Sequence, residues 1–160
     1  MSACGHVIMI FVKVISNLLN QNTHGEPYMK ADTVQLKFDS KYVGELTSPT
    51  GSIKLGSQEN GMKPYHLLFG ALASCFYATF LSVAEKMRVS FTDVDIEVSG
   101  NKRDETPATL DHVEIKMVVY NGSDQAKLKK AAELGAQYCS IHETISKVAK
   151  MDLIVTFETK

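Results

Sequence analysis

The chain has 160 residues, enough for one domain with a substantial hydrophobic core. Seventeen basic and eighteen acidic side chains leave a formal net charge of -1, so the sequence lacks the basic excess of a protein that binds nucleic acid or an anionic membrane. Three cysteines are too few, and odd in number, for the disulfide framework of a small secreted protein. We therefore expect a soluble cytoplasmic protein, in which a functional cysteine pair would serve redox chemistry.

Residues 1–30 differ from the rest of the chain. An apolar block between Val7 and Leu19 is followed by a polar stretch. The β-branched residues of the block favour a strand, whereas the spacing of its apolar positions suits a short amphipathic helix. We treat 1–30 as an N-terminal extension of unknown role and 31–160 as the folded domain.

The pattern between residues 33 and 55 predicts three short strands. Residues 33–38 alternate apolar and polar side chains, as a strand buried on one face does. Turn signals separate this segment from extended segments at 41–46 and 52–55. A loop at 56–63 follows.

A long helix is predicted from Pro64 to about Met87, because proline is favoured at the first helical position. Residues 67–84 carry no charge, which raises the question of a membrane span. Glycine, serine, threonine and alanine dilute this stretch, so we expect a core helix buried on all sides.

The rest of the chain predicts two strands, two helices and a last strand. Strands are expected at 92–101, 110–120 and 153–158, and a helix from Ser123 or Asp124 to about Tyr138. Ser140-Ile141-His142-Glu143 has the form of a capping box, so another helix should begin there and end near Lys150. The resulting order, β-β-β-α-β-β-α-α-β, indicates an α+β fold.

Two cysteines occupy different local settings. Cys75 lies in the long apolar helix, where an isolated thiol usually packs as a small hydrophobic side chain. Cys139 precedes a helix start, where the helix dipole favours a thiolate. A disulfide between them would require Cα atoms about 4.4–6.8 Å apart. We expect no metal site, because Cys139 with His142 and Cys4 with His6 give no complete set of four ligands.

The chain resembles the OsmC/Ohr family, the osmotically inducible and organic hydroperoxide resistance proteins. The resemblance lies in the order of elements, in the helix that begins at Pro64 and contains Ala73-Ser74-Cys75, and in the later cysteine that precedes a helix. The resemblance covers residues 31–160. It implies an OsmC-like fold, with antiparallel sheets and a long buried central helix, in an intertwined homodimer with active sites at the subunit interface. It also implies a hydroperoxide reductase without metal or cofactor. In that activity Cys75 is the peroxidatic thiol, Cys139 is the resolving thiol, and an external dithiol reduces the disulfide.

The chain departs from this family at the group that stabilises the thiolate. Hydroperoxide reductases of the family use an arginine from the N-terminal strands, held by a glutamate close after the proline. The only arginines here are Arg88 and Arg103, both after the first cysteine. The candidate substitutes are His66, Glu59 and Lys63, a lysine of the N-terminal strands, or water.

Three functions stay open. The first is a two-cysteine hydroperoxide reductase in oxidative stress defence. We expect it to act on organic hydroperoxides, because an apolar rim beside Cys75 would bury their alkyl chain, and each buried methylene contributes about 0.8 kcal/mol to binding. The second is a non-peroxidatic OsmC-like stress protein that binds a small apolar ligand. The third is a thiol-dependent enzyme that uses Cys75 on another electrophile.

Overall fold

The computed structural model describes residues 31–160, so the N-terminal extension and the prediction for its apolar block lie outside the described residues. The predicted order of elements and the α+β class are confirmed. The elements are β1 (Gln35–Phe38), β2 (Val43–Ser48), β3 (Gly51–Gly56), α2 (Pro64–Lys86), β4 (Asp93–Lys102), β5 (Leu110–Tyr120), α3 (Gln125–Tyr138), α4 (Ser140–Ser146) and β6 (Lys150–Glu158).

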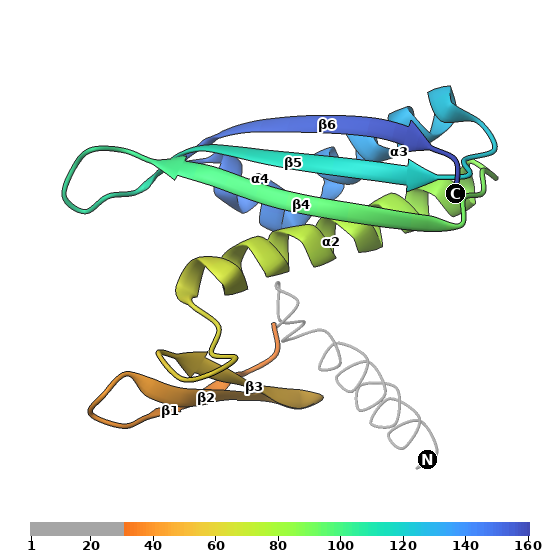
Figure 1. Ribbon diagram of the computed structural model, residues 1–160. Coiled ribbons are helices and arrows are strands. Elements are labelled where there is room, and N and C mark those ends of the chain that lie inside the picture. The colour runs from red at the N-terminus through yellow and green to blue at the C-terminus, as the bar shows by residue number, and fades with distance from the viewer. Residues whose placement is uncertain (1–30) are drawn as a thin grey trace, which may run out of the picture.

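The strands form two separate three-stranded sheets, β1-β2-β3 and β4-β5-β6 (Figure 1). The first sheet is an antiparallel meander, and β4 pairs with β5 in antiparallel fashion. The expectation of purely antiparallel sheets is wrong for β5 and β6, which pair in parallel. The reason is that α3 and α4 connect these two strands, and a helical crossover of this length lets the chain return in the same direction.

The helices cover one face of the β4-β5-β6 sheet, and the core lies between them and that face (Figure 1). The central strand β5 alternates buried and more exposed positions, so that one row of its side chains enters the core. α2 contributes a matching stripe at a spacing of four residues. The buried side chains of these two elements are Leu72, Phe76, Phe80, Ala84, Leu110, Val113, Ile115, Met117 and Val119.

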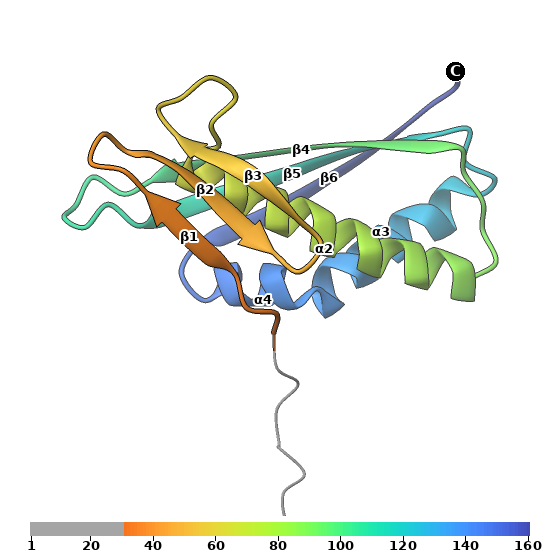
Figure 2. The same ribbon diagram turned by 90° about the horizontal axis from the view of Figure 1, so that it is seen from below.

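The single chain buries only this one stripe of α2. Ala71, Ser74 and Ala78, on another face of the helix, are exposed. The expectation of a helix buried on all sides is therefore not met within one chain. The physical reason is that the elements packed on α2 are α3, α4 and β4, which leave part of its circumference open. Figure 1 shows the first sheet lying apart from α2, on the side opposite the second sheet, and in the view from below the first sheet lies in front of α2 (Figure 2).

By length and composition α2 could cross a membrane. Its large apolar residues Leu72, Phe76 and Phe80 are nevertheless fully buried in the core with β5 and α3. α2 is therefore a core helix of this fold, as predicted from its diluted composition.

Two boundaries near the C-terminus differ from the predictions. α4 ends at Ser146, not near Lys150. β6 begins at Lys150, three residues before the predicted start, because its first residues continue the parallel register with β5 from His112 onward. α3 agrees with its prediction: Asp124 caps it and accepts a hydrogen bond from the Lys127 backbone N–H.

Candidate active site

Folding brings two cysteine thiols together where α2 meets residues 138–141, which we call the α3–α4 elbow. Cys75 lies midway along α2 and is partly buried, whereas Cys139 lies in the elbow and has no exposed surface. The two thiols lie close enough that each shifts the pKa of the other. The packing of α2 against both α3 and α4 holds this contact in place.

Cys139 forms the elbow because it caps two helices. Its N–H donates to the carbonyl of Ala136 at 3.3 Å, and its Sγ accepts from the backbone N–H of His142 at 3.4 Å. Its carbonyl also accepts from the N–H of Glu143 at 3.0 Å. The prediction that Ser140 caps α4 is wrong by one residue, because Cys139 has the extended backbone of a cap and Ser140 is already helical. The Ser140 hydroxyl is therefore not used for capping.

The elbow surrounds the Cys75 sulfur with hydrogen-bond donors. Cys75 Sγ lies 3.9 Å from Ser140 Oγ. Partial burial raises the pKa of Cys75, but hydrogen bonds from the Cys139 thiol, from the Ile141 backbone and from Ser140 outweigh burial and leave the pKa below the ordinary value. Cys75 is thus the thiol that ionises more readily.

Cys139 has the opposite character. Burial raises the pKa of Cys139 to about 11, and the hydrogen bond with Cys75 and the charge of Cys75 contribute to the same shift. Of the two thiols, Cys75 therefore ionises at the lower pH, and Cys139 stays protonated at neutral pH.

No arginine approaches this thiol pair in residues 31–160. The guanidinium of Arg103 donates to the backbone carbonyls of Leu110 and Val148 and pairs with Asp111 at 3.4 Å. Arg103 therefore ties the β4–β5 loop to the connection between α4 and β6. Arg88 follows the last turn of α2, where its backbone is left-handed with φ of 56°.

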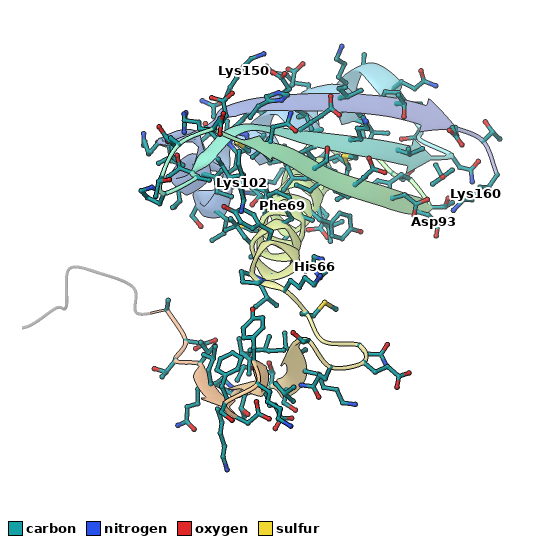
Figure 3. The ribbon with its side chains drawn as sticks, turned by 60° about the vertical axis from the view of Figure 1, so that its left-hand side comes forward. His66, Phe69, Asp93, Lys102, Lys150 and Lys160 are labelled. Atoms are coloured by element: carbon teal, nitrogen blue, oxygen red, sulfur yellow. The ribbon has the colours of Figure 1, made fainter. Side chains whose placement is uncertain are left out.

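The substitutes predicted from the sequence also lie elsewhere within the chain. The Nδ1 of His66 accepts a hydrogen bond from the backbone N–H of Lys63 at 3.3 Å, so His66 closes the first turn of α2. Nine residues separate His66 from Cys75, which corresponds to about 13.5 Å and the opposite face of an α-helix. Glu59 is exposed in the loop before α2. Figure 3 shows His66 at the end of α2 that faces the first sheet.

The donors that do reach Cys75 could not be predicted from the sequence pattern. The capping-box pattern predicts a capping role for Ser140, and the Ile141 backbone N–H has no side-chain signal. One clue was available, because Ser140 directly follows a cysteine already expected to approach Cys75. Within the described residues, no three histidine, cysteine or acidic side chains gather as a metal site would require. The Cys4 and His6 pair lies outside those residues.

The comparisons with known proteins show the family and the fold of the chain. Residues 56–153 match the family model described as OsmC, OsmC-like protein. Protein YhfA of Escherichia coli K12 is 24% identical over 114 residues, which are 69% of this chain and 84% of YhfA. A hypothetical protein from Aquifex aeolicus VF5 has a similar structure, with a TM-score of 0.69 and 26% identity over 81% of this chain and 99% of that one.

A more distant structural neighbour carries a functional name. It is an organic hydroperoxide resistance protein OsmC from Legionella pneumophila, described as a predicted redox protein. Its TM-score is 0.64, with 15% identity over 81% of this chain and 98% of that one. At this identity the likeness shows the shared fold.

Proposed function

Because the chain belongs to the OsmC-like protein family, we propose that it is a thiol-dependent hydroperoxide reductase that acts in oxidative stress defence. One observation carries the proposal: a partly exposed thiol of lowered pKa contacts a buried thiol whose pKa is raised to about 11. A two-cysteine peroxidase needs this division between an attacking thiolate and a protonated partner.

In the first step the Cys75 thiolate attacks the terminal oxygen of a hydroperoxide. The O–O bond breaks, its electron pair leaves with the alkoxide, and a proton from solvent completes the alcohol. Sulfur is oxidised to a sulfenic acid, and the peroxide is reduced. In the second step Cys139 loses its proton and attacks the Cys75 sulfur, which releases water and forms a disulfide. An external dithiol then reduces the disulfide to two thiols and is itself oxidised.

The pKa values give these steps an order. Burial raises the pKa of Cys139 most, and while Cys75 is a thiolate its hydrogen bond and its charge raise that pKa further. Conversion of Cys75 to a neutral sulfenic acid removes both effects. Cys139 then ionises more readily, at the stage when it must attack.

We propose organic hydroperoxides as the substrate class and the cytoplasm as the location. Cys75 lies in an apolar helix, with Ile141 partly buried beside it, and burial of an alkyl group there would contribute about 0.8 kcal/mol per methylene. Turnover of cumene hydroperoxide should therefore exceed that of hydrogen peroxide. Equal turnover would contradict the substrate class. A reducing compartment would supply the external dithiol.

We also propose that the protein works as a homodimer. Leu36, Phe38 and Ile53 of the first sheet are 51%, 45% and 38% exposed. Leu36 and Ile53 stand in one row across the sheet, through Leu46 of β2. A second copy of the chain could cover this apolar face and the open face of α2 together.

The homodimer is tested by Ala78→Lys on the exposed face of α2. Light scattering after size exclusion should give a dimeric mass for the wild type and a monomeric mass for the variant. Ala108→Lys, in the loop between β4 and β5, is the control and should stay dimeric. A monomeric wild type would contradict the proposal.

The enzymatic proposal is tested with three cysteine variants. Cys75→Ser should abolish peroxide consumption, and Cys139→Ser should accumulate a sulfenic acid that dimedone traps. Cys4→Ser serves as the matched control and should retain activity. Full activity in Cys75→Ser would refute the assignment.

The absence of an arginine beside Cys75 in residues 31–160 favours one second candidate, a non-peroxidatic OsmC-like protein that binds a small apolar ligand. Thiol titration separates the two functions. Loss of two thiols per chain after addition of peroxide supports the reductase, and no loss supports the binding protein.

A further inference from the structure

A thiolate in a partly apolar setting requires a stabilising partner, because burial favours the neutral thiol. In the part of the chain that the structure describes, no lysine or arginine side chain supplies that partner to Cys75. The donors around its sulfur all come from the α3–α4 elbow: the Cys139 thiol, the backbone N–H groups of Ser140 and Ile141, and the Ser140 hydroxyl. Of these, the Ser140 hydroxyl is the one that a conservative substitution can remove.

From this geometry we propose that Ser140 is a catalytic residue, whose hydroxyl donates a hydrogen bond to the Cys75 thiolate and keeps the nucleophile ionised. The inference rests on the proposed function in one respect, since it takes Cys75 as the reacting thiol. The Sγ–Oγ distance of 3.9 Å is within reach of a hydrogen bond to sulfur. A thiolate carries no proton, so in the ionised state Ser140 must be the donor.

The capping arrangement is what makes this hydroxyl available. Cys139 occupies the cap of α4 and satisfies the His142 N–H, so Ser140 is left as the first helical residue. Its carbonyl accepts from Thr144 Oγ1 at 2.8 Å, whereas its hydroxyl has Cys75 Sγ as its one hydrogen-bond partner among residues 31–160. Had Ser140 been the cap, its oxygen would have faced the N–H groups of α4 instead.

The size of the effect follows from the exposure of the contact. Ser140 is exposed in the single chain, so water competes for its hydroxyl. A long hydrogen bond to sulfur that is open to water stabilises the charged group less than a short, buried one does. We therefore expect Ser140→Ala to raise the pKa of Cys75 by roughly 0.5 to 1 unit, which is a threefold to tenfold loss of thiolate below the pKa.

The experiment measures the alkylation rate of Cys75 by iodoacetamide against pH, in the reduced full chain and without peroxide. Peptide mass spectrometry separates Cys75 from the other cysteines. Ser140→Ala should shift the midpoint upward by the amount given above, and Ser140→Thr, which keeps a hydroxyl, should restore most of it. An Ala variant with the wild-type midpoint would overturn the inference, as would a Thr variant that matches the Ala variant.

Circular dichroism shows whether the variants fold, and alanine is favourable at a helical position, so Ser140→Ala should fold. The two proposals fail separately. If the alkylation midpoint shifts but the wild type consumes no peroxide, Ser140 stabilises the thiolate and the reductase assignment falls. If Cys75→Ser abolishes peroxide consumption but Ser140→Ala leaves the midpoint unchanged, the reductase assignment stands and the role of Ser140 falls.

Discussion

α2 and α3 approach each other closely at Gly135 of α3. A Cβ atom added there would lie 3.0 Å from Cα of Phe80 and 3.1 Å from both its N and its Cβ. These atoms belong to the backbone or the base of the side chain in the middle of a 23-residue helix, so they cannot rotate away. We therefore predict that Gly135→Ala forces α3 outward by a few tenths of an ångström.

The stability change combines two opposing effects. Overpacking a well-packed contact costs about 1–3 kcal/mol, whereas replacing glycine by alanine inside a helix gains about 0.5–1 kcal/mol. We expect a net loss of about 1–2 kcal/mol in the free energy of unfolding, measured by urea denaturation of the reduced protein. Gln137→Ala, at an exposed position of the same helix, is the control and should change stability by less than about 0.5 kcal/mol.

The same substitution should also slow formation of the disulfide. Gly135 lies one turn before Cys139, and Phe80 lies just over one turn after Cys75, so the helix contact sets the distance between the two sulfurs. After peroxide treatment we expect a severalfold slower loss of the second thiol. A Gly135→Ala variant as stable as the wild type, with the same rate of disulfide formation, would refute the reasoning.

Three further predictions concern Cys139, Arg103 and Cys75. Cys139→Ala should lower the free energy of unfolding, measured by thermal unfolding, by about 0.5–2 kcal/mol, because the His142 N–H loses its acceptor. Cys139→Ser keeps an acceptor for this N–H and should be nearly as stable as the wild type. Arg103→Gln should lower the free energy of unfolding by about 1–2 kcal/mol, because the hydrogen bonds to Leu110 and Val148 are lost. The alkylation rate of Cys75 should stay unchanged, and a changed rate would place Arg103 at the site. Because only the thiolate reacts, the alkylation rate of Cys75 should rise with pH and level off at a lower pH than for an unfolded cysteine peptide, whose pKa is about 8.5. Cys139 should stay unlabelled at pH 8. A midpoint for Cys75 at or above the peptide value would contradict the lowered pKa.

The secondary structure was predictable because its signals are local. Alternation identified the strands, Pro64 marked the start of α2, and Asp124 marked the start of α3. The parallel pairing of β5 with β6 was not predictable in this way. A strand has the same alternating pattern whichever way its neighbour runs, so the crossover through α3 and α4 decides the direction.

The contact between Cys75 and Cys139 was accessible from the sequence only through the resemblance to a family. Composition and periodicity place one thiol inside a helix and the other just before a later helix, and say nothing of the distance between them. That distance depends on the close approach at Gly135, where a helix-disfavoured residue is required by packing. A glycine inside a predicted helix is the one local sign of such a contact.

The thiolate partner was missed for a different physical reason. The need for a stabilising group was predictable, because a partly buried thiolate must be compensated. A sequence shows the charged side chains that could do this. Hydrogen-bond donors of a turn cannot be read in the same way, because each non-proline residue carries the same backbone N–H. Their direction depends on which residue caps the following helix, and the cap fell on Cys139, one position before the serine. That single shift turns Ser140 from a capping residue into a donor beside the Cys75 sulfur, so an error of one residue in a helix boundary concealed the group best placed to replace the arginine.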